Sequence, residues 1–337
     1  EEPVLVADVR PAVRSKMIDQ ILDNNGFFRG TATYELVHPR NKRKAKVVYT
    51  IIPGPAFPLD TIEYAPDTTA LLHAVDSLAR RDPYLQPGMR FSTDSLSIAR
   101  NRITNSLRNR GYYFFRPDYI EYLADSVQTP GKIALRLDVA NNLPAWAGNK
   151  YKTGNITVVV NRYNGFQVPD TFELRPGLTL VQMQPTRLRR ALIPECITFK
   201  RGRVFSVRDM DRTQTYLARL GIFRGIDVTA FPDTTATEPT LNVLVNCTFD
   251  APLETTIEVN ASSKSNSYIG PGLTLGLTNR NIFGGGEQLS VQLTGAYERQ
   301  TGRGNRGGIF NSYEAGISGS LAFPRLLAPN FIKRSRR

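Results

Sequence analysis

The chain has 337 residues, 41% of them hydrophobic, which is enough for two or three domains with ordinary cores. Its formal net charge of +13 fits a nucleic-acid partner, an anionic membrane surface or a plain basic surface, and charge alone does not choose among them. Two cysteines, Cys196 and Cys247, exclude a disulfide-stapled framework and a zinc ribbon. They leave open either two buried thiols or one disulfide between them. No apolar run approaches the ~20 residues of a membrane-spanning helix.

A repeated pattern runs along the first 250 residues. Three helix-like stretches end in Leu-x-x-x-Gly and are followed at once by bulky apolar residues. The leucines are Leu22, Leu107 and Leu217, and the glycines are Gly26, Gly111 and Gly221. A glycine here closes a helix in the left-handed conformation, so each segment predicts a helix that turns directly into a strand. The stretches FSTDSL and FSVRDM predict Ser, Thr or Asp caps where the second and third of these helices begin.

The surrounding residues extend each pattern to the order strand, helix, helix, strand, strand. After each glycine we expect two strands joined by a polar turn, and before each helix another strand and a first helix. In the second repeat the strands are expected at 112–123 and 132–139 and the first helix at 68–80; in the third, the strands at 222–231 and 240–249 and the first helix at 185–193. The first repeat begins near its second helix, at 13–24, so its opening strand and helix are expected upstream of Glu1.

The last quarter of the chain changes character. Four stretches alternate strictly between apolar and polar residues, which indicates β-strands with one apolar and one polar face. In the first stretch Ile257 and Val259 face one way, and Glu254, Glu258 and Asn260 face the other. The connections SKSNS and RQTGRGNRGGIFN are polar loops, and FGGG between them is short. Short turns at one end and longer loops at the other favour a transmembrane β-barrel over a soluble sandwich.

The triple glycine, Gly284 to Gly286, lacks the Lys-Ser/Thr of a phosphate-binding loop and leads into a strand. It is therefore predicted to be a β-hairpin turn in which glycines supply positive φ. Pro271 lies inside the preceding strand, where it removes a ladder donor, and it predicts either a strand start or a locally frayed pairing. Since a bacterial barrel needs at least about eight strands, the four strands predict a barrel that continues past Arg337.

The residues quoted above carry a resemblance. Serial βααββ units with the helix–Gly–aromatic junction resemble POTRA domains. The segment from Gly270 to Glu298 resembles the surface-antigen barrel region, and FPRLL from Phe323 looks like its next periplasmic turn. Together they look like the BamA/TamA superfamily of outer-membrane assembly proteins, and most like its TamA-like members from Bacteroidetes. This implies an α+β fold with a partial POTRA domain at 1–55, POTRA domains at 56–142 and 151–250, and the first four strands of an outer-membrane barrel at 251–337.

The resemblance also implies a function. It predicts an assembly or translocation factor of the Gram-negative outer membrane, whose periplasmic POTRA arm binds unfolded outer-membrane proteins by β-augmentation and passes them to the barrel. The expected client-binding residues are Tyr112, Tyr113, Phe114, Phe115, Ile222, Phe223, Ile226 and Val228. Further implied partners are outer-membrane lipid and accessory lipoproteins or an inner-membrane protein, with no nucleic acid. The run KRSRR at the C-terminus is expected either at lipid headgroups or in a solvated turn.

In the family the first barrel strand pairs weakly with the last and opens as a lateral gate. The matching residues are Glu254, Ile257, Glu258, Val259 and Asn260. The turn of Gly284, Gly285 and Gly286 is expected on the periplasmic side. The family's Arg-Gly motif of a late barrel loop is not in this segment, so nothing is carried over for it.

Enzyme chemistry is not predicted. His38 and His73 have no further metal ligands nearby in the sequence, and no Gly-x-Ser-x-Gly elbow occurs, so we expect no catalytic residue, metal or cofactor. Two other functions stay open. One is a two-partner secretion transporter of the same architecture, against which the three repeats argue. The other is a basic RNA-binding protein with an all-β tail, for which GRGNRGG is a weak signal.

Overall fold

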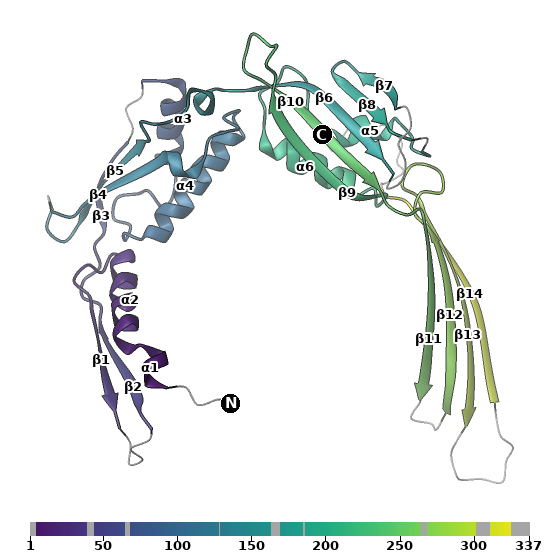
Figure 1. Ribbon diagram of the computed structural model, residues 1–337, viewed down its shortest axis with the longest axis horizontal. Helices are drawn as coiled ribbons and strands as arrows, with labels where there is room; N and C mark the ends of the chain where they lie inside the picture. The colour runs from purple at the N-terminus through teal and green to yellow at the C-terminus, as the bar shows by residue number, and fades with distance from the viewer. Residues whose placement is uncertain are drawn as a thin grey trace. The chain divides into compact units, whose positions relative to one another are not determined.

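The computed structural model describes residues 5–38, 44–64, 68–127, 129–162, 169–184, 186–263, 268–300 and 311–324. Within them the chain is an α+β protein whose strands form four sheets (Figure 1). It divides into two compact units, one of residues 1–151 with 205–207 and the other of residues 152–204 with 208–337. The predicted α+β class is confirmed, with helix-and-sheet repeats first and antiparallel strands last.

The first repeat is two helices on a two-stranded sheet. Its elements are α1 (Val6–Val9), α2 (Pro11–Asn24), β1 (Thr31–Val37) and β2 (Lys46–Ile52). Helix α2 is held to β1 by polar contacts at one residue: the Ser15 hydroxyl donates to the Ala32 carbonyl at 2.5 Å, and the Ala32 N–H donates to Asp19 Oδ1 at 2.6 Å. Leu22 is buried beneath them.

The second repeat has the expected order βααββ. Its elements are β3 (Leu59–Glu63), α3 (Ala70–Ala79), α4 (Thr93–Arg108), η1 (Pro117–Tyr119), β4 (Ile120–Asp125) and β5 (Ile133–Val139), followed by η2 (Ala145–Gly148). The sheet order is β3-β5-β4, with β3 parallel and β4 antiparallel to β5. Ala99, Ile103 and Leu107 form one stripe of α4 and are buried. They share a hydrophobic core with Leu135 and Leu137 from β5 of the sheet.

The strand predicted at 112–123 is wrong at its beginning. Strand β4 begins at Ile120, and residues 112–115 lie in a turn before it. Two causes act together. Pro117 has no backbone N–H and opens the short helix η1, and the aromatic side chains before it are used for packing, with Tyr112 and Phe115 buried.

The third repeat carries an insertion that the sequence pattern did not predict. Its elements are β6 (Lys152–Asn161), β7 (Asp170–Arg175), β8 (Leu178–Gln182), α5 (Leu192–Cys196), α6 (Val207–Ala218), β9 (Phe223–Pro232) and β10 (Thr240–Phe249). The sheet order is β7-β8-β6-β10-β9, so the hairpin β7–β8 extends the sheet beside β6. The first helix is α5 and not the predicted 185–193: it begins only at Leu192, and before it the Arg189 N–H donates to the Gly284 carbonyl at 2.8 Å and not within a helix.

The last sheet has four antiparallel strands in chain order. They are β11 (Leu253–Ser263), β12 (Tyr268–Asn279), β13 (Gln288–Gln300) and β14 (Asn311–Ala322). The register places Ile257 opposite Leu275, Leu275 opposite Leu293 and Leu293 opposite Ile317. The row beside it is Thr256, Gly276, Gln292 and Ser318. The predicted separation into an apolar and a polar face is therefore confirmed.

Of the two expectations at Pro271, a locally frayed pairing is confirmed and a strand start is wrong, because β12 begins at Tyr268. The β11–β12 ladder runs through this position, with Pro271 opposite Ala261. On the other side, pairing of β12 with β13 stops at Ile269 and resumes at Gly272. A Cβ on the intervening Gly270 would lie 1.6 Å from the Tyr297 carbonyl oxygen, so glycine is required there.

Candidate functional site

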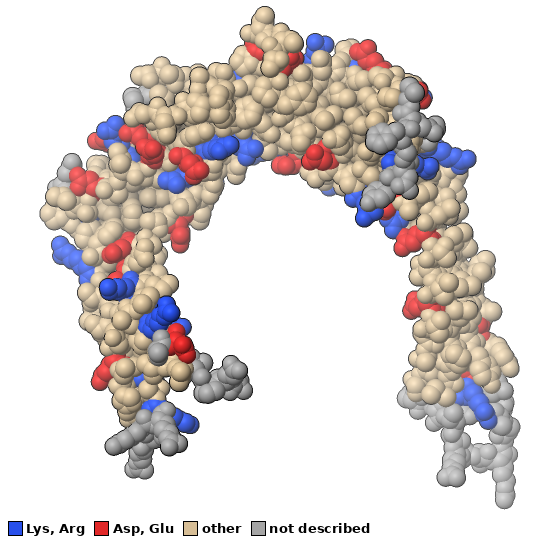
Figure 2. All heavy atoms as spheres, in the orientation of Figure 1, with Lys and Arg blue, Asp and Glu red and all other residues tan. Residues whose placement is uncertain are grey.

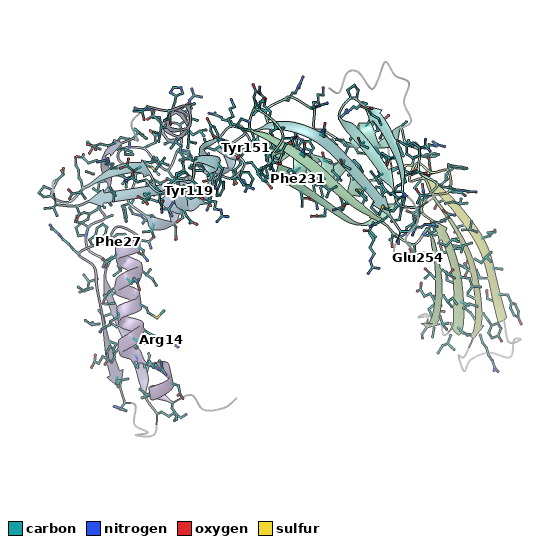
Figure 3. The ribbon with its side chains drawn as sticks, turned by 45° about the horizontal axis from the view of Figure 1, so that its top comes forward. Arg14, Phe27, Tyr119, Tyr151, Phe231 and Glu254 are labelled. Atoms are coloured by element: carbon teal, nitrogen blue, oxygen red, sulfur yellow. The ribbon has the colours of Figure 1, made fainter. Side chains whose placement is uncertain are left out.

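Two strands of the repeats lie at free sheet edges. Strand β4 is at one edge of the three-stranded sheet, and β9 is at one edge of the five-stranded sheet. On β9 the side chains of Asp227, Thr229 and Phe231 are exposed, and Figure 3 shows Phe231 on this strand. An edge strand presents unpaired N–H and C=O groups that can accept a further strand. Both repeats therefore offer an edge for β-augmentation.

The predicted client-binding residues separate into two sets. Phe223, Ile226 and Val228 lie on β9, half-buried, and Ile222 is buried just before it. The four aromatic residues of the second repeat lie on no edge strand. The Phe114 ring contacts the rings of Trp146 and Tyr151 at 5.3 and 5.4 Å, so this segment is internal packing.

The helix–Gly–aromatic junction has a second use in the first unit. The Gly26 carbonyl accepts a hydrogen bond from the Phe57 N–H at 2.9 Å, and the ring of Phe28 lies 5.5 Å from that of Phe91. A Cβ on Gly26 would lie 2.7 Å from the Phe91 carbonyl oxygen. The glycine thus allows close approach of the second repeat as well as closing α2 with its φ of 81°.

The same contacts recur at the next glycine. The Gly111 carbonyl accepts from the Tyr151 N–H at 2.9 Å, and the rings of Tyr113 and Phe205 lie 5.0 Å apart. Phe91 and Phe205 each precede a serine and a helix, so the sequence pattern was interpreted as capping alone. An apolar residue before the cap was the signal for a joint. We call Phe57 and Tyr151, whose N–H groups bond these glycines, the entry aromatics. The glycine, the entry aromatic and the Phe-Ser pair together are the repeat joint.

The triple glycine is part of a folded connection. Strand β12 ends at Asn279 and β13 begins at Gln288, so the predicted tight turn is wrong in length. Gly284 and Gly286 have φ of 84° and 82°, as predicted. Glu287 is 5% exposed, and its Oε2 accepts a hydrogen bond from the Gly285 N–H at 2.7 Å. We call residues 280–287 the glycine turn.

The glycine turn is anchored to the third repeat, within the second unit. The Arg189 N–H donates to the Gly284 carbonyl at 2.8 Å, and Arg189 Nη1 lies 3.1 Å from Glu287 Oε1. A Cβ on Gly286 would lie 2.6 Å from the Leu220 carbonyl oxygen and 3.1 Å from Pro324 Cγ. The sequence pattern could not predict this contact, because its partners are far apart in the chain. The glutamate after three glycines was its one local signal.

Strand β11, expected as the gate strand, lies at an edge of its sheet. Ile257 and Val259 are 68% and 75% exposed on the apolar face, and Glu258 and Asn260 are exposed on the other. Glu254 lies at its beginning (Figure 3) and is bonded to Arg280, which also lies 2.9 Å from Asp250. The start of β11 is thus fixed by ion pairs, whereas its middle is held on one side by β12 alone.

The apolar face of the four-stranded sheet is uncovered. Its exposed members are Leu253, Ile257, Val259, Ile269, Leu273, Leu275, Leu277, Leu293, Tyr313, Ile317 and Leu321. Figure 2 shows mostly uncharged atoms over this sheet, with a few Asp, Glu, Lys and Arg side chains among them. A contiguous apolar surface of this kind marks a contact with lipid or with another protein.

Cys196 and Cys247 are buried and are not joined by a disulfide in the structure. Burial first, and the neighbouring Cys196 second, raise the pKa of Cys247 from 9.0 to about 12. Between pH 9 and about 12 the unfolded chain therefore ionises this thiol while the folded chain keeps it neutral. The free energy of unfolding is unaffected below pH 9 and falls as pH rises from 9 through 12.

We expect neither thiol to react with dithiobis(nitrobenzoate) at pH 8 in the native chain, and both to react in guanidinium. The measurement is the release of thionitrobenzoate without reductant. A count of zero in guanidinium, restored by prior reduction, would instead demonstrate a disulfide.

Among the residues described, no group of three or more His, Cys, Asp or Glu side chains could hold a metal ion. No helix in this part of the chain is long and apolar enough to cross a membrane.

Comparisons with known proteins give structural likenesses at low sequence identity. No protein-family model matches the chain, and no curated protein matches it. Solved structures that are similar include BamA from Haemophilus ducreyi lacking POTRA domains 1–3 (13% identity, TM-score 0.43, 80% of this chain and 48% of that one). CdiB from Acinetobacter baumannii is also similar (14% identity, TM-score 0.35, 93% of this chain and 51% of that one). So is POTRA1–3 of Omp85 from Anabaena (17% identity, TM-score 0.27, 74% of this chain and 92% of that one). The chain thus spans about half the length of that BamA structure. These TM-scores are low, so the inferences below depend on the chain's own residues.

Proposed function

We propose that the chain is part of an outer-membrane assembly or translocation factor of the BamA/TamA type. Its helix-and-sheet repeats lie in the periplasm, and its four-stranded sheet is the beginning of a membrane barrel. Unfolded outer-membrane proteins add a strand to the free edges of the repeats and are passed to the sheet. The finer assignment to TamA-like proteins of Bacteroidetes belongs to the same proposal.

One observation carries this proposal: the register of the four-stranded sheet places apolar side chains in continuous rows across all four strands. Leu275, Leu293 and Ile317 are 41%, 49% and 75% exposed in one such row. Such rows would be costly in water and are what the lipid face of a barrel requires. The polar row on the other face suits a water-filled lumen.

The client-binding strands of this proposal are β4 and β9. In β4, Leu123 is 56% exposed and adds an apolar side chain to this edge. In β9, Ile226 and Val228 alternate with exposed Asp227 and Thr229. Main-chain hydrogen bonds to such an edge are tolerant of sequence, as binding of varied clients demands.

We expect a photo-crosslinking side chain at Leu123 or Thr229 to capture a urea-unfolded bacterial porin. The full chain would be reconstituted in phospholipid vesicles, the porin added by dilution, and crosslinked products read on a denaturing gel. Crosslinking should fall when the porin is folded beforehand, because its strands are then paired.

The matched control is the same side chain at Thr215, which is exposed on α6 of the third repeat. Equal capture at Thr215 and at the strand positions would contradict β-augmentation. A salt-sensitive RNA complex without porin capture would support the RNA-binding alternative. The segments GRGNRGG and KRSRR, which bear on that alternative and on headgroup contact, lie outside the described residues.

A further inference from the structure

A cavity of about 180 Å³ lies in the second unit, where the third repeat meets the four-stranded sheet. Its charged walls are the arginines Arg162, Arg187 and Arg280, with Asp250 beside them. Its apolar walls include Ile222, Phe249 and Pro252. We call it the arginine cavity.

The charge of this cavity is positive after its internal ion pairs are counted. Arg280 forms ion pairs with both Asp250 and Glu254, so these three side chains together carry one negative charge, and Arg162 and Arg187 bring the sum to about +1. In the part of the chain that the structure describes, no carboxylate pairs with Arg162 or Arg187, and both are exposed. Two uncompensated guanidinium groups on one cavity favour an anion with several acceptor oxygens.

The size of the cavity narrows the class of anion. Typical sites for drug-sized ligands and cofactors measure roughly 300–1,000 Å³, so this one is too small for a nucleotide. At about 180 Å³ it has room for several water molecules, which suits a phosphate and a few attached atoms. The rings and methyl groups of Phe249 and Ile222 offer an apolar wall to those attached atoms.

The place of the cavity in the fold indicates the source of the phosphate. Pro252 and Asn279 line it, and they lie where β11 begins and β12 ends. This is the same end of the sheet as the glycine turn. If the apolar face lies in lipid, as the proposed function requires, this end is at the level of the headgroups. Resting on that function, we propose that the arginine cavity binds the phosphate of an anionic phospholipid.

The test is a titration of the full chain in neutral detergent micelles with dioctanoyl phosphatidylglycerol, followed by native mass spectrometry. We expect one specific lipid per chain. The double variant Arg162→Gln/Arg187→Gln should weaken its Kd about tenfold or more, because both charge-assisted contacts are lost. The matched control Arg14→Gln/Arg116→Gln removes the same charge from exposed positions of the first unit and should leave Kd unchanged.

Two outcomes would overturn the proposal. One is an equal Kd for the cavity variant and the control variant, which would mean that net charge alone attracts the lipid. The other is binding of inorganic phosphate with the same affinity and the same dependence on Arg162 and Arg187, which would make the site one for free phosphate. The titration uses micelles and no porin, so absence of lipid binding would contradict the arginine-cavity proposal alone. Absence of porin capture in vesicles would contradict the proposed function.

Discussion

Replacing Glu287 by alanine should release the glycine turn from the third repeat. The buried carboxylate is shared by the Gly285 N–H and the Arg189 guanidinium, so its removal leaves a donor and a cation without an acceptor. Such a loss costs about 1–3 kcal/mol. Hydrogen exchange of the glycine-turn amides in the full chain should therefore accelerate about 5- to 150-fold.

Three further variants make this prediction sharp. Glu287→Gln keeps an oxygen for Gly285 but loses the charge, so its effect should be intermediate. Gly286→Ala should also accelerate exchange, because its φ is 82° and its Cβ would meet the Leu220 carbonyl. Gly295→Ala is the matched control, since a Cβ there meets nothing within 4 Å. Unchanged exchange in Glu287→Ala would show that the anchor does not hold the turn.

Replacing Leu293 by arginine should prevent stable membrane integration. Leu293 lies on a central strand between Leu275 and Ile317, in the apolar row that we place in lipid. An arginine at the lipid midplane of a barrel costs about 2–4 kcal/mol, which is about 30- to 900-fold in an equilibrium. The measurement is the fraction of full chain that stays in vesicles after extraction with urea.

The neighbouring residue provides the control. Gln292 is on the same strand, and its side chain lies on the polar face of the sheet. Its cross-strand partners are Gly276 and Ser318. Gln292→Arg adds the same charge to the polar face and should be tolerated. Equal loss in both variants would mean that the rows do not separate lipid from lumen, and the barrel proposal would fail.

The elements that depend on local pattern could be predicted from the sequence. Strict alternation placed Ile257 and Leu275 on one face, and the closing glycines marked where α2 and α4 end. The segment around Tyr112 was predicted as strand because aromatic residues favour strands, yet packing and Pro117 prevail. Propensity describes a residue's average surroundings, and this segment's surroundings come from residues far along the chain.

The candidate site was less predictable for the same reason. The edge position of β9 follows from the order of elements, so Ile226 and Val228 could be predicted. The ion pair of Arg189 with Glu287 could not, because the glycines before Glu287 mark a turn but do not indicate a partner 98 residues away in the chain. The arginine cavity likewise gathers side chains from segments more than a hundred residues apart. Contacts between such distant segments leave no periodic pattern of apolar and polar residues in the sequence, so they could not be predicted from it.

The repeat joint has a consequence for how the number of repeats can change. The second repeat supplies both halves of the joint: Phe57 with the pair Phe91-Ser92 at its beginning, and the closing Gly111. The first repeat supplies a closing glycine, Gly26, and the third supplies Tyr151 with the pair Phe205-Ser206. A deletion of residues 57–150 would bring Tyr151 and Phe205 to Gly26, in place of Phe57 and Phe91. The hydrogen bond to the glycine carbonyl and the ring contact would both be kept. Unequal recombination between repeats can therefore lengthen or shorten the arm in one genetic event, with no new interface to evolve.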